Sequence, residues 1–268
     1  MVALLERDNA RFRMLLDIGA SVTCVNEMGT PALAYALKDL EAVRMLLDAG
    51  ADPNYAYPRS NKNLFHQLGF AGADFSPEVA STLWDRMKTN EAFLNSAEEQ
   101  SGYTPLSIAC MFKNAKAVRW FLDHGAHIDY VGKGFLEDNV VETAMMKAIV
   151  WNGDAEVDKE DTECLKLLIK KGADVNWKTK GGVTATMHAA IYGNAKALRV
   201  LLDNGADVNL SIEGEAAEDF LDWGPSDGPE KANLEEAMKG YTAAQMAADE
   251  GHEECLKMLI AKGAKYTP

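Results

Sequence analysis

Hydrophobic and polar positions in Thr184–Asn209 follow a pattern that predicts two short helices joined by a tight turn. The first, Ala185–Tyr192, carries small alanines where a second helix could approach closely. The second, Ala195–Asp203, has leucines at the spacing of one helix face. Gly205 ends it, since glycine accepts the left-handed cap conformation at no steric cost. This unit is too short to be stable alone and therefore needs neighbours.

The same unit recurs along the chain with a period near 33 residues. The turn sequence GADVN occurs at 172–176 and 205–209, with variants at 19–23, 50–54 and 125–129. The first-helix sequence GYTPLSIA occurs at 102–109 and a variant, GYTAAQMA, at 240–247. Self-similarity at a fixed period predicts a stacked array in which each unit packs on its neighbours.

These motifs resemble the ankyrin-repeat family, whose pattern is G-x-T-P-L-H-x-A-A, then G-H, then L-L-L-x-x-G-A-D-V-N. The resemblance covers the whole chain in about seven imperfect copies. It implies an all-α solenoid of stacked helix-turn-helix units with β-hairpin-like finger loops, forming a single domain over 1–268. We place the repeats at approximately 1–27, 28–61, 62–99, 100–138, 139–179, 180–209 and 240–268, with an acidic insertion at 210–239 and a smaller one at 154–161.

Two of these copies depart from the pattern. Repeat 3 (62–99) is the most divergent, and its second helix is predicted to start at Ser76-Pro77, because proline suits the first helical position. Repeat 1 begins in the middle of the motif. That start fits either a degenerate N-terminal cap or a piece of a longer protein.

Charge narrows the class of partner. The net charge is −14, from 27 basic and 41 acidic residues, which argues against nucleic acid or an anionic membrane as a partner. Basic or apolar protein segments are favoured instead. The chain has no apolar run of about 18 residues and no basic-then-apolar leader pattern.

The insertion 210–239 carries nine acids and two lysines, which is half of the net charge. One interpretation is a solvated loop. The other is an arm that captures a basic partner and steers its approach.

Four cysteines are spread over four repeats, whereas a disulfide framework would cluster them. We expect buried free thiols in a reducing compartment, hence a cytoplasmic protein, with secretion as an effector left open. We expect a monomer.

Aromatic residues recur at one position of three consecutive repeats. By resemblance, the positions seven and eight after the motif threonine face a concave groove where partners bind. They read Met111-Phe112, Val150-Trp151 and Ile191-Tyr192, with Phe70 as a further candidate. Because repeats stack about 10 Å apart, the aromatics should form a ladder that binds a partner.

Phe220 and Trp223, in the acidic insertion, complete the candidate partner-binding residues. Two alternatives stay open for the ladder. Its side chains could pack under long loops, or Phe220, Leu221 and Trp223 could fold back over it as a self-ligand. A further polar candidate is His188, which occupies an inner-helix position equivalent to Lys147. A satisfied local hydrogen bond is the simpler interpretation of that pair.

No catalytic, cofactor or metal motif stands out. Gly132-Lys133-Gly134 lacks the length and ending of a P-loop, and His252-Glu253-Glu254 lacks the second histidine of a zinc-protease helix. The sequence therefore predicts a non-enzymatic protein–protein interaction scaffold that binds a protein partner through its concave groove. The main alternative is a targeting or inhibitory module, of effector or toxin-immunity type, in a larger bacterial or host-directed system. An enzyme built on the insertion is disfavoured, because 210–239 holds no cysteine or histidine and only Ser211 and Ser226.

Overall fold

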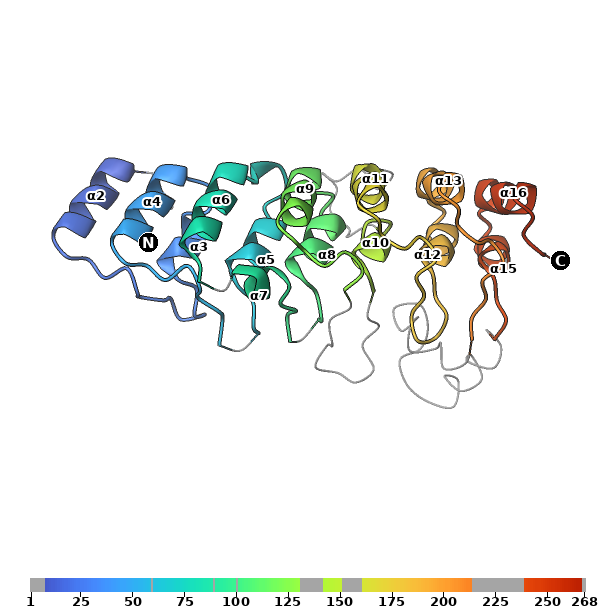
Figure 1. Cartoon of the computed structure of the whole chain (residues 1–268), viewed down its shortest axis with the longest axis horizontal. Coiled ribbons are helices and arrows are strands. Elements are labelled where there is room, and N and C mark those ends of the chain that lie inside the picture. Colours follow the sequence, from blue (N-terminus) through green and yellow to red (C-terminus); the bar gives the residue numbers. More distant parts are fainter. Residues whose placement is uncertain are drawn as a thin grey trace.

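The computed structural model describes residues 8–58, 60–88, 90–99, 101–130, 142–150, 161–213 and 239–266. Helices stand side by side in two parallel rows, with finger loops extending beyond the inner row (Figure 1). The outer row is α2 (Asn9–Asp17), α4 (Leu40–Asp48), α6 (Pro77–Arg86), α9 (Ala115–Asp123), α11 (Glu163–Lys170), α13 (Ala195–Asp203) and α16 (Glu253–Ala261). The inner row is α3 (Ala32–Tyr35), α5 (Leu64–Gly69), α8 (Pro105–Met111), α10 (Ala144–Lys147), α12 (Ala185–Ile191) and α15 (Ala243–Asp249). This arrangement confirms the predicted all-α solenoid; the repeat boundaries and their number stay a prediction.

Polar residues of the repeated motif begin the helices. The Thr104, Thr143 and Thr184 hydroxyls each accept a hydrogen bond from the backbone N–H three residues later, at the starts of α8, α10 and α12. Asn114 and Asn194 do the same with their side-chain oxygens at the starts of α9 and α13. Each such cap satisfies a backbone donor that the helix leaves unpaired.

The turn between α12 and α13 also joins one repeat to the next. Gly193 has φ +63°, and a Cβ there would lie 2.6 Å from the ring of His252. The His252 Nε2–H donates to the carbonyl of Ile191 at 2.9 Å. A side chain at position 193 would therefore push the last helix pair away.

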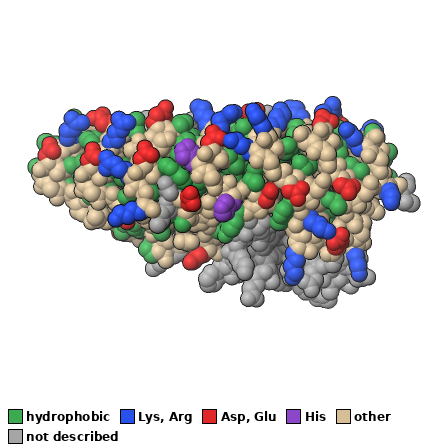
Figure 2. Space-filling model, in the orientation of Figure 1, with side chains coloured by type: hydrophobic (Ala, Val, Ile, Leu, Met, Phe, Trp, Pro, Cys, Tyr) green, Lys and Arg blue, Asp and Glu red, His purple; other side chains and the backbone are tan. Residues whose placement is uncertain are grey.

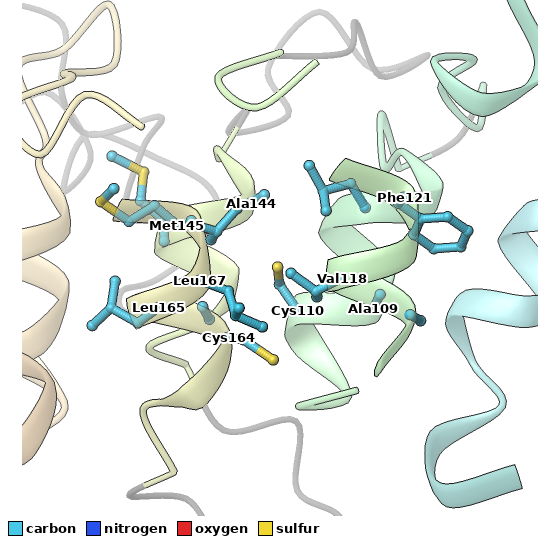
Figure 3. Close-up of a cluster of buried hydrophobic side chains, with 14 of the residues drawn as sticks. Ala109, Cys110, Val118, Phe121, Ala144, Met145, Cys164, Leu165 and Leu167 are labelled. Atoms are coloured by element: carbon cyan, nitrogen blue, oxygen red, sulfur yellow. The ribbon is translucent and has the colours of Figure 1, made fainter. Parts of the chain in front are cut away.

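A continuous apolar core runs between the two rows of helices. Figure 3 shows its middle, where Cys110 of α8 and Val118 of α9 lie near Cys164 of α11. All three are at most 1% exposed. Cys255 is buried too, but Cys24 is exposed, so the expectation of buried thiols is wrong for that residue. Cys24 lies in the finger loop after α2. Because α2 is the first helix of the described residues, no described repeat packs over that loop from the N-terminal side.

Repeat 3 reaches the same architecture by a different route. Ser76 caps α6 and Pro77 begins it, as predicted. A 3-10 turn, η1 (Gly72–Asp74), precedes α6, and a short helix, α7 (Asn90–Leu94), stands where other repeats have Gly-Ala-Asp. Leu94 is fully buried, and its apolar side chain anchors this substitute turn.

Two inner helices are shorter than the other inner helices of the array. α3 spans only Ala32–Tyr35, because Ala36 already caps it and Asp39 starts α4 three residues later. α10 likewise spans only Ala144–Lys147. Both insertions lie mostly outside the described residues. The described ends of the larger one pair as a finger, since Ser211 bridges Thr242 and the Ile212 N–H donates to Tyr241 O at 2.9 Å.

Asparagines at the finger turns clamp each repeat to the next. Asn176 donates from Nδ2 to Gly205 O at 3.2 Å and accepts from the Asp207 N–H at 2.8 Å. Equivalent pairs join Asn95 to Gly125 and His127, and Asn209 to Gly263 and Lys265. Asp129 takes this place after α9 but only accepts, from the Asp174 N–H at 3.2 Å. Its Oδ1 is buried and has no hydrogen-bond partner among the described residues.

Candidate functional site

The predicted aromatic positions lie at the C-terminal ends of the inner helices. Phe70, Phe112 and Tyr192 are the C-cap residues of α5, α8 and α12. We call the surface formed by these helix ends the inner-helix face. Phe70 and Phe112 meet edge to face with ring centroids 5.0 Å apart, so the two adjacent repeats present one continuous aromatic surface. Phe70 is 38% exposed and Tyr192 is 45% exposed, so part of each ring is open to solvent.

The remaining predicted site residues differ in their exposure. Met111 and Val150 are half-buried. Ile191 is buried and belongs to the core beneath Tyr192. Trp151 lies outside the described residues, as do Phe220 and Trp223. The described part of the ladder therefore consists of the Phe70–Phe112 pair and, two repeats beyond Phe112, Tyr192.

A cluster of largely buried polar side chains connects residues of three consecutive repeats. The Lys147 amine donates to the Tyr103 hydroxyl at 2.9 Å and lies 4.5 Å from the centre of that ring. The same amine pairs with Glu142, whose other carboxylate oxygen lies 3.3 Å from His188 Nε2. His188 is not aligned for a hydrogen bond at that distance. We call these four residues the ionic column.

Burial and charge act against each other in the ionic column. Burial alone would raise the pKa of Glu142, but the adjacent His188 and Lys147 outweigh it and hold that pKa below its usual value. For Lys147, burial would lower the pKa, yet Glu142 and the hydrogen bonds raise it overall. Burial lowers the pKa of His188 despite Glu142. Lys147 and Glu142 thus remain a charged pair at neutral pH, with His188 neutral beside them.

The sequence pointed to Lys147 and His188 but missed the residue that links them. Glu142 immediately precedes the capping Thr143, at a position where other repeats carry Tyr103, Val183 and Tyr241. A carboxylate at that mostly apolar or aromatic position, five residues before a lysine at an apolar position, is the signal that could have found the pair. None of its four residues is exposed, and Lys147 is the last residue of the short helix α10.

Two lysines at the N-terminal end of the inner-helix face are paired with acids. The Lys62 amine lies 5.9 Å from the centre of the Phe70 ring and pairs with Glu98 at 2.7 Å. Lys38 pairs with Asp74 at 2.6 Å. Cations also alternate with acids along the outer helices, at the upper edge of Figure 2. Ion pairs link neighbouring outer helices there, as between Arg86 and Asp48 at 2.8 Å.

The described residues show no constellation for catalysis. No group of three or more potential metal ligands occurs in the part of the chain that the structure describes. Burial raises the pKa of Cys164 to about 12 and that of Cys255 to about 11, so neither thiol ionises readily. No helix among the described ranges has both the length and the apolarity to cross a membrane. What the site offers is an apolar surface on a rigid support.

Comparisons with known proteins agree with this architecture. A family model described as "Ankyrin repeats (3 copies)" matches residues 135–212 and 157–268, and a single-repeat model matches 101–129. Among solved structures, the chain resembles the ankyrin repeat domain of Bcl-3, described as a unique member of the IkappaB protein family. That match has a TM-score of 0.61 and 22% sequence identity, over 79% of this chain and 87% of the other. The low identity makes it a likeness of fold.

Proposed function

Because this chain belongs to the ankyrin-repeat family, we propose that it is a non-enzymatic scaffold that binds a protein segment on its inner-helix face. Ankyrin arrays act as protein-interaction modules, and the fold alone does not identify the partner. The observation that carries the proposal is the exposed aromatic surface at the ends of α5, α8 and α12. Half-buried Met111 and Val150 extend its apolar area.

The exposure of these aromatics is what favours binding over a purely structural role. Phe65, which is 0% exposed, shows what a core phenylalanine looks like in this protein. Phe70 and Tyr192 instead keep more than a third of their surface open. Exposed aromatics on a preformed surface give contact energy with little loss of conformational freedom, so they commonly dominate binding.

The partner we propose is a segment with apolar and basic residues, bound by a monomer in a reducing, cytoplasmic compartment. The negative net charge supports a basic segment. Within the described ranges all four cysteines are free, which is consistent with such a compartment. The acidic insertion 210–239, with Phe220 and Trp223, would steer the approach of the partner. Trp151 would add a rung between Phe112 and Tyr192.

Affinity capture from native lysate tests the proposal. The test variant replaces Phe70, Phe112 and Tyr192 by alanine. The matched control replaces Met14, Ile18 and Ile260, which are exposed apolar residues on or beside the outer helices. We expect a protein that is retained by the wild type and the control but lost from the test variant, while circular dichroism shows both variants folded. Equal capture by all three proteins would place the binding surface elsewhere.

A further inference from the structure

The inner-helix face changes character at the last helix pair. Asp249 and Glu250 end α15 at the positions that Ile191 and Tyr192 occupy at the end of α12. Both acids are exposed. Asp249 lies beside Tyr241 and raises the pKa of its hydroxyl, which hydrogen-bonds to the carboxylate. One repeat beyond Tyr192, the apolar surface is therefore replaced by two carboxylates.

These carboxylates differ from the charges at the opposite end of the face. Lys38 and Lys62 are each bound to an acid, so the N-terminal end presents little net charge. No ion pair to Asp249 or Glu250 occurs among the described residues, although Glu253 and Glu254 on the next helix both have basic partners. The face thus runs from lysines paired with acids, over exposed aromatics, to two carboxylates that form no ion pair with any described residue.

We propose that the segment bound on this face lies in one direction, with apolar side chains over Phe112 and Tyr192 and Lys or Arg over Asp249 and Glu250. The inference rests on the proposed function and adds the chemistry and polarity of the ligand. A basic residue at the Tyr192 end meets two carboxylates, whereas the reversed segment would bring it to cations that are already paired. Such complementarity sets orientation and rejects wrong partners more than it adds affinity.

The distance between stacked repeats predicts how many residues separate the apolar and basic positions of the bound segment. Phe112 and Tyr192 are two repeats apart, about 20 Å, and Glu250 is about 10 Å farther. An extended segment rises about 3.3 Å per residue, so its basic residue would come about three positions beyond the apolar one over Tyr192. A helix would need about seven positions. In both conformations the basic residue stands on one fixed side of the apolar residues.

A random peptide display library tests this predicted separation without knowledge of the natural partner. The library is selected on the wild type and on Asp249→Asn/Glu250→Gln, in which the amide of residue 249 still accepts from the Tyr241 hydroxyl. The control, Glu253→Gln/Glu254→Gln, removes the same charge from the outer helix of the same pair. We expect Lys and Arg at one fixed separation on one side of the apolar positions. This enrichment should disappear only with the first variant.

Affinities of the selected peptides complete the test. They should bind the Asp249→Asn/Glu250→Gln variant about three- to tenfold more weakly and the control unchanged, because exposed charge pairs contribute modestly. Peptides without basic enrichment, with enrichment on both sides, or with enrichment that survives the Asp249→Asn/Glu250→Gln change would overturn the inference. Selected peptides that ignore replacement of Phe112 and Tyr192, or a library that yields no binders, would instead remove the proposed function itself.

Discussion

Two neighbouring junctions of the array are held by opposite kinds of interaction. Between repeats 3 and 4, the ring centroid of Phe65 lies 6.0 Å from that of Trp84, 5.7 Å from that of Trp120 and 6.2 Å from that of Phe121. Aromatic packing therefore joins α5 and α6 to α9. Between repeats 4 and 5, the ionic column joins Tyr103 to Lys147 instead. We call these the aromatic junction and the ionic junction.

The contrast teaches how one fold tolerates different cores. The aromatic junction gains stability directly from the apolar area that it buries. Its finger turns are joined by two hydrogen bonds of Asn95, which donates to the Gly125 carbonyl and accepts from the His127 N–H. At the ionic junction, the attraction between Lys147 and Glu142 must first offset the cost of burying their charges. Its finger turns are joined by the one hydrogen bond that Asp129 accepts from the Asp174 N–H. We therefore expect the ionic junction to specify geometry while contributing less to stability.

Removing Phe65 should have the largest effect. Phe65→Ala would leave a cavity at the centre of the aromatic junction and lower the free energy of unfolding by about 4 kcal/mol. Urea denaturation followed by tryptophan fluorescence measures it, because Trp84 and Trp120 report on this junction. The control is Phe70→Ala on the same helix pair, where the ring is partly exposed. Equal losses from both variants would show that the junction does not depend on its buried aromatic core.

Breaking the ionic column from one side should cost about 3 kcal/mol. Glu142→Gln leaves the Lys147 charge buried without its partner. The double variant Glu142→Leu/Lys147→Met, which removes both charges, should recover most of that loss. The measurement is again the free energy of unfolding in urea. If the double variant were as unstable as the single one, the column would stabilise the array in its own right, and the contrast between the junctions would fail.

The two junctions should also differ in their response to acid. Burial lowers the pKa of His66, beside the aromatic junction, from 6.5 to about 4. The unfolded chain then binds the proton more readily, so stability is full above about pH 6.5 and is lost as the pH falls toward 4. His66 alone should cost about 2 kcal/mol between pH 7.5 and pH 5.

Single variants separate the contributions of His66 and His188 to this loss of stability in acid. His66→Gln should flatten the pH dependence of the unfolding free energy more than His188→Gln does. The reason is that a Glu142 carboxylate oxygen lies 3.3 Å from His188 Nε2, whereas no ion pair to His66 occurs among the described residues. Lys62 also opposes the effect of Glu98 on the pKa of His66. A larger flattening from His188→Gln would reverse the assignment.

The finger clamp of the ionic junction can be improved. Burial raises the pKa of Asp129, so its charged form lowers the stability of the folded state at neutral pH. Asp129→Asn should remove that cost and supply the missing Nδ2 donor, raising the unfolding free energy by about 0.5–1 kcal/mol. Differential scanning calorimetry at pH 7 measures the change. Asn176→Asp, the reverse change at a complete clamp, should lower stability by a similar amount, and no change in either variant would argue against the clamp.

Most of the solenoid could be predicted because its features are local. The capping threonines and asparagines and the α13 limits at Ala195 and Asp203 follow from residues a few positions apart. Even the start of α6 at Pro77 in the divergent repeat was predicted, since Ser-Pro needs no distant partner. The family resemblance then supplied the order in which these units stack.

What could not be predicted depends on contacts between repeats. The ionic column needs Glu142, Lys147 and His188 to meet, and the last two are 41 positions apart in the chain. The contact between the His252 ring and the Ile191 carbonyl at 2.9 Å likewise joins residues 61 positions apart. The helix α7 stands where other repeats have a Gly-Ala-Asp turn, and its Leu94 is fully buried by contacts that no motif in repeat 3 predicts.

Hydrogen–deuterium exchange of the chain with and without a selected peptide locates the bound segment on the array. We expect slower exchange at the C-terminal ends of α8, α12 and α15, where Phe112, Tyr192 and Glu250 line the inner-helix face, with the outer helices unchanged. Protection confined to the outer helices α9, α13 and α16 would contradict this expectation, because the partner would then bind the opposite side of the array.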